Sequence, residues 1–166
     1  PDHSGLDVAL IAGVAATISN QEREPIMNNV TRAEKLLEGF NNADWDLIRE
    51  HAGDKLQYKE MATGRETHGV DAWIENSKGW RSAFSNATGV VQSRIEAGDR
   101  VIEEVVWQGT HDGDMLTPDG QTIPATHKNI AVPAVIVNTF EDGKLVSANN
   151  YFDMMTMMHQ LGLINN

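Results

Sequence analysis

The chain has 166 residues, of which 40% are hydrophobic and 22% are charged, a composition typical of one globular domain and not of a disordered chain. Asp and Glu outnumber Lys and Arg by 24 to 13, so the formal net charge is -11. Because the basic residues are also scattered singly, this charge argues against nucleic acid or an anionic membrane as a partner. The absence of cysteine excludes disulfides, thiolate metal sites and a cysteine nucleophile.

Residues 1–27 differ in character from the rest and are predicted to be an N-terminal extension to one domain over residues 28–166. The longest apolar stretch, residues 8–18, is too short to span a bilayer and lacks the basic flank of a secretory signal. We therefore expect a cytoplasmic protein. A removed presequence stays open, because the sequence starts at Pro1 and not at Met.

The first part of the domain is predicted to be mainly helical. Apolar residues at helical spacing predict a helix over residues 28–40, and a second, short helix over 44–51 begins with Asp44 as its N-cap. A strand is predicted over residues 55–61, and a third helix over 72–84.

From residue 88 the apolar period changes to two, which indicates strands. Residues 88–96 and 100–110 are predicted to form a hairpin that turns at residues 97–99. The second of these strands carries apolar side chains on both faces, so both faces must be covered. Helices can cover one face, and we expect a partner subunit to cover the other.

A loop over residues 112–124 precedes a long predicted strand over 126–140, in which Pro133 fits only an edge strand or a bulge. An Asp-Gly turn then leads into a strand over 144–152 and a closing helix over 154–161. Helices followed by an antiparallel sheet predict an α+β fold, in which the sheet curls over the helices and encloses a pocket.

Three segments together resemble the SnoaL-like polyketide cyclases, or ester cyclases, of the NTF2-like superfamily. They are residues 109–113, residues 118–120, and the run of residues 141–162 that contains Tyr-Phe-Asp and ends in Gln-Leu-Gly. The resemblance implies an NTF2-like cone fold, usually a homodimer, around an apolar pocket that uses no metal and no organic cofactor. The best-known members close a polyketide ring by an intramolecular aldol condensation.

The resemblance also maps the family's acid/base carboxylate onto Asp153. This residue directly precedes a helical run, where Asp is a routine N-cap, so both roles are open. The two roles have opposite effects on the pKa, because amide donors at a helix N-terminus lower it and an apolar pocket raises it. The sequence departs from the family nearby, since many relatives carry Trp where this chain has Asn149.

By period two, Asn149 and Tyr151 share the face of Asp153 on the last strand. They are candidate substrate-binding residues that would donate hydrogen bonds to an enolate or another substrate oxygen. The alternative is that they only satisfy the backbone at the end of the sheet. Trp107 and Tyr58 are further candidate substrate-binding residues.

His111 is the second candidate catalytic residue, either as a pocket donor or as a second acid, although a histidine in a turn is often structural. Together with His127 and the aspartates at positions 112 and 114 it shows no recognised metal-ligand spacing, so no metal site is expected. Methionines along the closing helix are expected to be mainly core, and would also suit a bulky planar ligand.

The leading interpretation is a cofactor-independent enzyme, an aldol cyclase, lyase or isomerase, that moves protons on a hydrophobic carbonyl compound with Asp153 as acid/base. One alternative is an isomerase, dehydratase or epoxide hydrolase of the same fold. The other is a non-catalytic small-molecule-binding or protein-interaction domain, since one fold hosts many functions.

Overall fold

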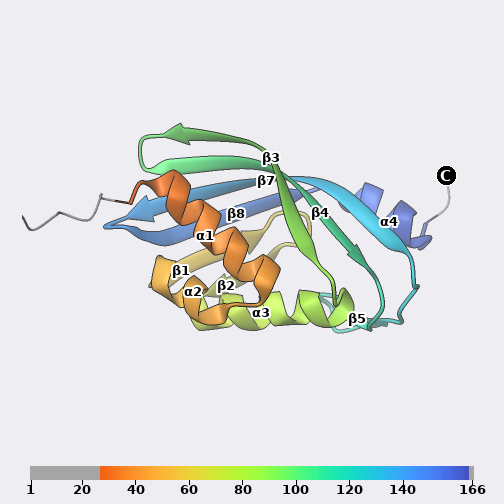
Figure 1. Ribbon diagram of the computed structural model, residues 1–166. Helices are drawn as coiled ribbons and strands as arrows, with labels where there is room; N and C mark the ends of the chain where they lie inside the picture. Colours follow the sequence, from red (N-terminus) through yellow and green to blue (C-terminus); the bar gives the residue numbers. More distant parts are fainter. Residues whose placement is uncertain (1–26, 165–166) are drawn as a thin grey trace, which may run out of the picture.

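The computed structural model describes residues 27–164, so all but the last residue of the predicted N-terminal extension lies outside the described residues. Six strands form a curved sheet in the order β2-β1-β8-β7-β4-β3, with all neighbours antiparallel except β1 and β8 (Figure 1). The strands of this sheet are β1 (Ala52–Glu60), β2 (Arg65–His68), β3 (Thr88–Ala97), β4 (Arg100–Thr110), β7 (Asn129–Glu141) and β8 (Lys144–Phe152). A separate short ribbon joins β5 (Met115–Leu116) and β6 (Thr122–Ile123), inside the segment predicted to be a loop.

Three helices cover the concave face of this sheet: α1 (Asn29–Asn42), α2 (Trp45–His51) and α3 (Val70–Ala83). α1 packs on β3 and β4, whereas α3 packs on β1 and β2. The closing helix, α4 (Met154–Leu161), continues from the end of β8 and packs on β7. Among the described residues, no helix is both long enough and apolar enough to cross a membrane.

The predicted helix ends are confirmed where a side-chain cap defines them. The Asp44 side chain accepts a hydrogen bond of 3.0 Å from the Leu47 amide, which makes it the N-cap of α2. At the other end of the chain, Gly162 closes α4 in the left-handed conformation, with φ of 71°.

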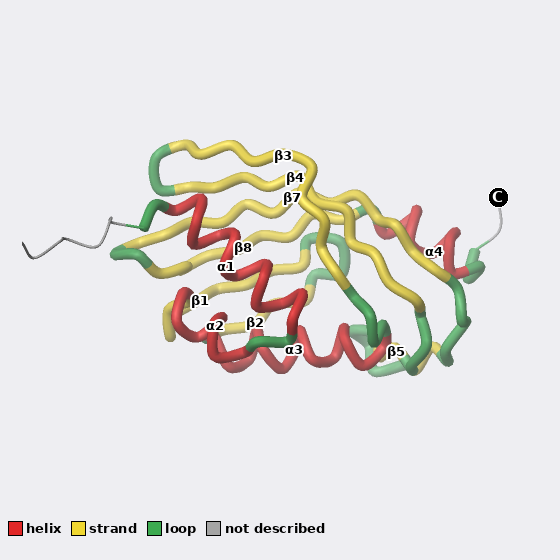
Figure 2. Tube along the Cα trace, in the orientation of Figure 1, coloured by secondary structure: helices red, strands yellow, loops and turns green. Residues whose placement is uncertain are grey.

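The β3 and β4 hairpin is also confirmed, and it shows how the two faces of the sheet differ (Figure 2). Val101 and Val105 are buried beneath the helices, while Ile102 and Val106 lie on the opposite, convex face and are only half-buried. The helices thus cover one apolar face of β4 and leave the other uncovered by the described residues.

Pro133 was expected at an edge strand or a bulge, but β7 lies inside the sheet between β4 and β8. β7 as a whole is therefore not an edge strand. At Pro133 itself, however, β7 has no strand partner on the β8 side, because β8 pairs with β7 only as far as Phe152, opposite Ala134. Beyond that point the Pro133 carbonyl accepts a hydrogen bond of 3.2 Å from the Asp153 amide. The Pro133 nitrogen, which has no hydrogen to donate, therefore points beyond the end of β8, where the sheet requires no backbone donor.

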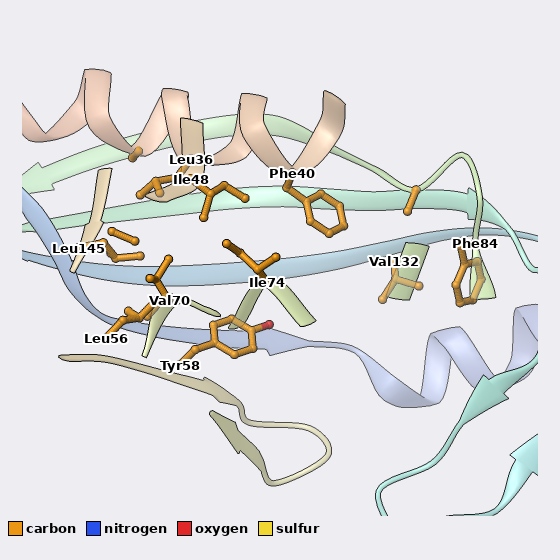
Figure 3. Packing of buried hydrophobic residues seen from close by; sticks show 14 of the residues in the cluster. Leu36, Phe40, Ile48, Leu56, Tyr58, Val70, Ile74, Phe84, Val132 and Leu145 are labelled. Carbon is orange, nitrogen blue, oxygen red and sulfur yellow. The ribbon is translucent and has the colours of Figure 1, made fainter. Parts of the chain in front are cut away.

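At one end of the cone the core is tightly packed. Ile48, Leu56 and Ile74 have no exposed surface, and Val70 is 7% exposed (Figure 3). These side chains pack between α2, α3 and β1. Tyr58 stands beside them and turns its hydroxyl away from the packed end (Figure 3).

Candidate functional site

A cavity of about 110 Å³ lies between the concave face of the sheet and helices α1 and α3. On the same measure a single water needs only about 10–15 Å³, so the space admits a small organic molecule. Most of its wall is aromatic or aliphatic. The aromatic members are Phe40, Trp73, Trp80, Phe84, Trp107 and Phe152, together with Tyr58.

The polar side chains of the cavity wall come from two adjacent rows across the sheet. In one row Glu103 faces Ile136, which in turn faces Asn150. In the next row Asn138 faces Ala148, which faces Tyr58. Facing residues of neighbouring strands share one side of a sheet. The rows therefore hold four polar groups, which we call the polar stripe: Glu103, Asn138, Asn150 and Tyr58.

At one end of the polar stripe Glu103 is only 2% exposed. Its Oε1 accepts a hydrogen bond of 2.7 Å from Nε of Arg94, and its Oε2 accepts one of 2.9 Å from Nδ2 of Asn138. Arg94 extends outward to Glu34, with 3.0 Å between the charged atoms. The buried negative charge of Glu103 is thus paired with a cation and keeps both oxygens hydrogen-bonded.

At the other end Nδ2 of Asn150 lies 3.3 Å from the Tyr58 hydroxyl oxygen and donates to it. The amide oxygen of Asn150 has no partner among the described residues, although the residue is 7% exposed. Burial, and then the nearby charge of Glu60, raise the pKa of Tyr58. The phenol therefore keeps its proton at physiological pH and can donate it in a hydrogen bond.

Trp107 contributes another donor without a partner. Its ring packs edge-on against Phe40 at 5.2 Å, and its buried Nε1 finds no acceptor among the described residues. A buried polar group left unpaired costs free energy. A bound molecule that carries a hydrogen-bond acceptor and a donor would satisfy both Trp107 and Asn150.

A second buried carboxylate, Glu60, stands behind the wall. Its Oε1 accepts hydrogen bonds of 2.6 Å from Trp80 Nε1 and 2.9 Å from Asn76 Nδ2, and its Oε2 accepts one of 2.9 Å from Thr63. The Arg65 guanidinium lies 4.0 Å away. Glu60 thereby fixes two side chains of the cavity wall, Trp80 and Asn76.

The structure places Asp153 outside the cavity, contrary to the expectation from the resemblance. Asp153 is exposed and caps α4, accepting hydrogen bonds of 3.0 Å from the Thr156 amide and 2.7 Å from the Thr156 hydroxyl. These bonds lower the pKa of Asp153, the direction expected of a cap. Asn149 and Tyr151 do share its face, but it is the convex face, on which Tyr151 is 46% exposed.

The alternation predicted along the end of β8 is present, and a β-bulge earlier in the strand determines which residues face inward. Leu145 faces Phe140 and Ser147 faces Thr139, so Val146 is an extra residue on β8. Both Leu145 and Ala148 consequently line the cavity, and the inward positions shift by one residue. Asn150, and not Asn149, is the inward-facing amide.

His111 is fully buried and stacks on Phe84, with ring centroids 5.0 Å apart. Its Nδ1 accepts a hydrogen bond of 3.2 Å from the Thr126 amide, so the proton resides on Nε2, which has no partner among the described residues. Burial lowers its pKa, which favours the neutral ring. His111 does not line the cavity and lies behind Phe84.

Of the four predicted substrate-binding residues, Trp107 and Tyr58 line the cavity and the other two do not. Glu103, Asn138 and Asn150 were missed. The available signal was a charged residue at an inward position, since Glu103 alternates with the buried Val101 and Val105. Within residues 27–164, no three metal-ligating side chains gather closely enough to hold a metal ion.

The family model described as SnoaL-like polyketide cyclase matches residues 30–161 of the chain. No curated protein sequence matches the chain. Among solved structures, a predicted SnoaL-like polyketide cyclase from Jannaschia sp. CCS1 is 21% identical with a TM-score of 0.74, over 87% of this chain and 99% of that one.

IdmH, a predicted polyketide cyclase from Streptomyces antibioticus, is 23% identical with a TM-score of 0.69, over 80% of this chain and 97% of its own. A protein of ketosteroid isomerase-like fold from Catenulispora acidiphila, solved with trimethylamine, is 16% identical with a TM-score of 0.66, over 79% of this chain and 92% of its own. At these identities the structures establish the fold, and the α+β cone predicted from the sequence is confirmed.

Proposed function

The chain belongs to the family of SnoaL-like polyketide cyclases, and from this premise we propose that it is a cofactor-independent enzyme that transfers protons on a hydrophobic carbonyl compound bound in the cavity. One observation carries the proposal. Trp107 Nε1 and the Asn150 amide oxygen have no partner among the described residues, and the Tyr58 hydroxyl accepts from Asn150 and can still donate its own proton, within a wall that is mostly apolar.

The donors suit an oxygen on which negative charge develops. A CH₂ group beside a carbonyl is weakly acidic, and loss of its proton moves charge onto the carbonyl oxygen. A hydrogen bond from the Tyr58 hydroxyl or from the Trp107 indole would stabilise that charge more strongly in an apolar cavity than in water. The Asn150 amide oxygen would accept a hydrogen bond from a hydroxyl elsewhere on the same ligand.

A non-catalytic carrier of such compounds is the second candidate function. The observation that favours it is that both buried carboxylates near the cavity already have partners, Glu103 in an ion pair and Glu60 in a hydrogen-bonded network. A carrier needs the donors and the apolar wall but no group that accepts a proton.

Binding of β-tetralone, a bicyclic aromatic ketone, tests the ligand class against naphthalene, which has similar rings and no carbonyl. Three of the four tryptophans line the cavity, so quenching of their fluorescence reports occupancy. The ketone should bind more tightly than the hydrocarbon. Tyr58→Phe should reduce ketone affinity by about two- to tenfold, the effect of one net hydrogen bond, and leave naphthalene unchanged. Equal affinity for the two compounds in the wild-type protein would contradict the proposal.

A homodimer through the convex face of the sheet is a separate part of the proposal. Val90 is 41% and Ile95 59% exposed there, and Tyr151 adds an aromatic ring. Burying such apolar side chains against a second copy would remove them from water. Light scattering over a concentration series should give twice the monomer mass, and Ile95→Lys should lower it. A monomer at all micromolar concentrations would contradict this.

A further inference from the structure

We propose that Glu103 is the carboxylate that takes the substrate's proton and returns it, and that Arg94 and Asn138 are positioning residues for it, a role that rests on the proposed function. Glu103 lines the cavity with its carboxylate buried, at the end of the polar stripe opposite Asn150 and Tyr58.

The acceptor capacity of Glu103 distinguishes it from Glu60. An ionised carboxylate offers about four lone-pair positions. Glu103 uses two of them, for Arg94 and Asn138, and so each oxygen can accept one more hydrogen. Glu60 accepts three hydrogen bonds, has Arg65 nearby, and does not itself line the cavity.

The spacing along the sheet leaves room for a substrate between Glu103 and the donors. Glu103 on β4 and Asn150 on β8 are separated by the single strand β7. Neighbouring strands lie about 4.8 Å apart, so the two backbones are roughly 10 Å apart on this curved sheet. The apolar Ile136 lies between Glu103 and Asn150 in their row, and the apolar Ala148 lies between Asn138 and Tyr58 in the next. A carbonyl held by Tyr58 would then point its neighbouring carbon toward Glu103.

The reaction that follows is a proton transfer with all atoms and electrons retained. A C–H bond beside the carbonyl breaks, its proton goes to a Glu103 oxygen, and its electron pair forms the enolate. The charge on the enolate oxygen is stabilised by the hydrogen bond from the Tyr58 hydroxyl. Glu103 then returns the proton, either to carbon or, where the enolate has attacked a second carbonyl to close a ring, to the new alkoxide oxygen.

Arg94 fixes the orientation and charge of Glu103. Its Nε–H donates a hydrogen bond to one Glu103 carboxylate oxygen, and its ion pair with Glu34 anchors the guanidinium at the surface. The amide of Asn138 holds the second oxygen. The carboxylate plane is thereby set from both sides before a substrate binds, which limits the reorganisation needed in the reaction.

Exchange of the acidic hydrogens of β-tetralone in D₂O, followed by proton NMR, tests the step without knowledge of the natural substrate. The wild-type protein should accelerate the exchange with saturation in ketone. Glu103→Gln should lower the rate at saturation by about 10² to 10⁴, the usual contribution of a general acid/base group. Its affinity for the ketone, measured by tryptophan fluorescence, should stay close to wild type.

Glu104→Gln is the matched control, because Glu104 is the next residue on β4 and is exposed on the convex face. There its carboxylate accepts a hydrogen bond from the Ser93 hydroxyl. The substitution should leave exchange and binding unchanged. Glu103→Asp keeps a carboxylate but withdraws it by one methylene, so it should give an intermediate rate and covers the case in which the Gln variant fails to fold. Arg94→Met removes the neighbouring positive charge and should move the pH profile of exchange to higher pH.

The outcomes separate this role from the proposed function. If the wild-type protein does not bind the ketone, the proposed function fails. If it binds the ketone but exchange is not accelerated, the enzymatic function fails together with the role of Glu103, and the carrier remains. If the wild-type protein accelerates exchange and Glu103→Gln keeps the wild-type rate, only the role of Glu103 is overturned. Loss of exchange in Glu60→Gln with full activity in Glu103→Gln would assign the proton to Glu60. A pH profile that Arg94→Met leaves unmoved would overturn the positioning role of Arg94.

Discussion

The two buried carboxylates stand at opposite ends of one row across the sheet, since Glu60 faces Asn150 and Glu103 faces Ile136 in the same register. They are equally buried, with exposures of 0% and 2%, but their surroundings differ. Three neutral donors bond Glu60 and Arg65 lies 4.0 Å away, whereas one cation and one amide hold Glu103 beside the cavity. Burial of a charge therefore does not by itself mark a reactive group. What marks it is unused acceptor capacity that faces space for a ligand.

The largest expected loss of stability follows from removing Glu60. Glu60→Leu leaves Trp80, Asn76 and Thr63 without their acceptor, and each unsatisfied buried donor costs about 1–3 kcal/mol, so the total should be about 3–5 kcal/mol. Glu103→Leu should cost less, about 1–3 kcal/mol, because Arg94 keeps Glu34 and is 21% exposed. Urea unfolding monitored by circular dichroism compares the two variants. The reverse order would mean that Glu103 is the structural carboxylate.

An effect on stability of the opposite sign is expected at Asn150, at the end of the polar stripe away from Glu103. The Asn150 amide oxygen is unsatisfied, so Asn150→Leu, which has the same branched shape and can extend its extra volume into the cavity, should leave the free energy of unfolding unchanged or raise it by about 1 kcal/mol. The same substitution should weaken β-tetralone binding. A stability loss of several kcal/mol would show that the unmatched amide is satisfied in the ligand-free protein and carries no binding function.

A third buried titratable group, His111, sharpens the comparison through pH. Burial lowers the pKa of His111 in the folded protein, so the unfolded chain binds the proton more readily. The contribution of the neutral ring to the free energy of unfolding is therefore present above about pH 6.5 and is lost as the pH falls below that value. Melting temperatures from pH 8 to pH 5 should fall less in His111→Gln than in the wild-type protein. His51, whose pKa burial also lowers, should account for part of the decline that remains. Identical curves would contradict the assignment of a buried neutral His111.

The smallest effects are expected at Asp153. Asp153→Asn keeps a capping oxygen and should change neither the melting temperature nor ketone exchange, whereas Asp153→Ala should lower the melting temperature slightly. The hydrogen bonds that Asp153 accepts lower its pKa in the folded protein. The ionised cap should therefore stabilise the protein at pH values above the ordinary pKa of an aspartate, and this contribution should be lost as the pH falls below that pKa and through the lowered one. A large loss of exchange in Asp153→Asn would return the acid/base role to this residue.

The sequence was sufficient for the four helices and the five longer strands, and insufficient for the short strands β2, β5 and β6 and for which side of β8 faces the cavity. Local signals determine a helix cap such as Asp44 or a hairpin turn at residues 97–99, and these could be predicted from short windows. The inward positions of β8 depend on one unpaired residue, Val146, that only the partner strands define. Glu103 was missed for a related reason, because a single charge within an apolar strand gains its meaning from Arg94 on the neighbouring strand.

The extra residue at Val146 also determines where the chain can change in length. Deleting Val146 would remove the bulge and leave Ala148 and Asn150 facing inward, because the pairing with β7 would then be continuous. Inserting one residue directly after Ala148 would instead turn Asn149 and Tyr151 inward and Asn150 outward, so one codon there would reverse the chemical lining of this wall. The exposed turn at Asp142 precedes the bulge and could be lengthened while β8 keeps its pairing with β7. Two neighbouring sites on this hairpin thus differ sharply in their tolerance of insertions and deletions, and the intolerant one selects which amide the ligand meets.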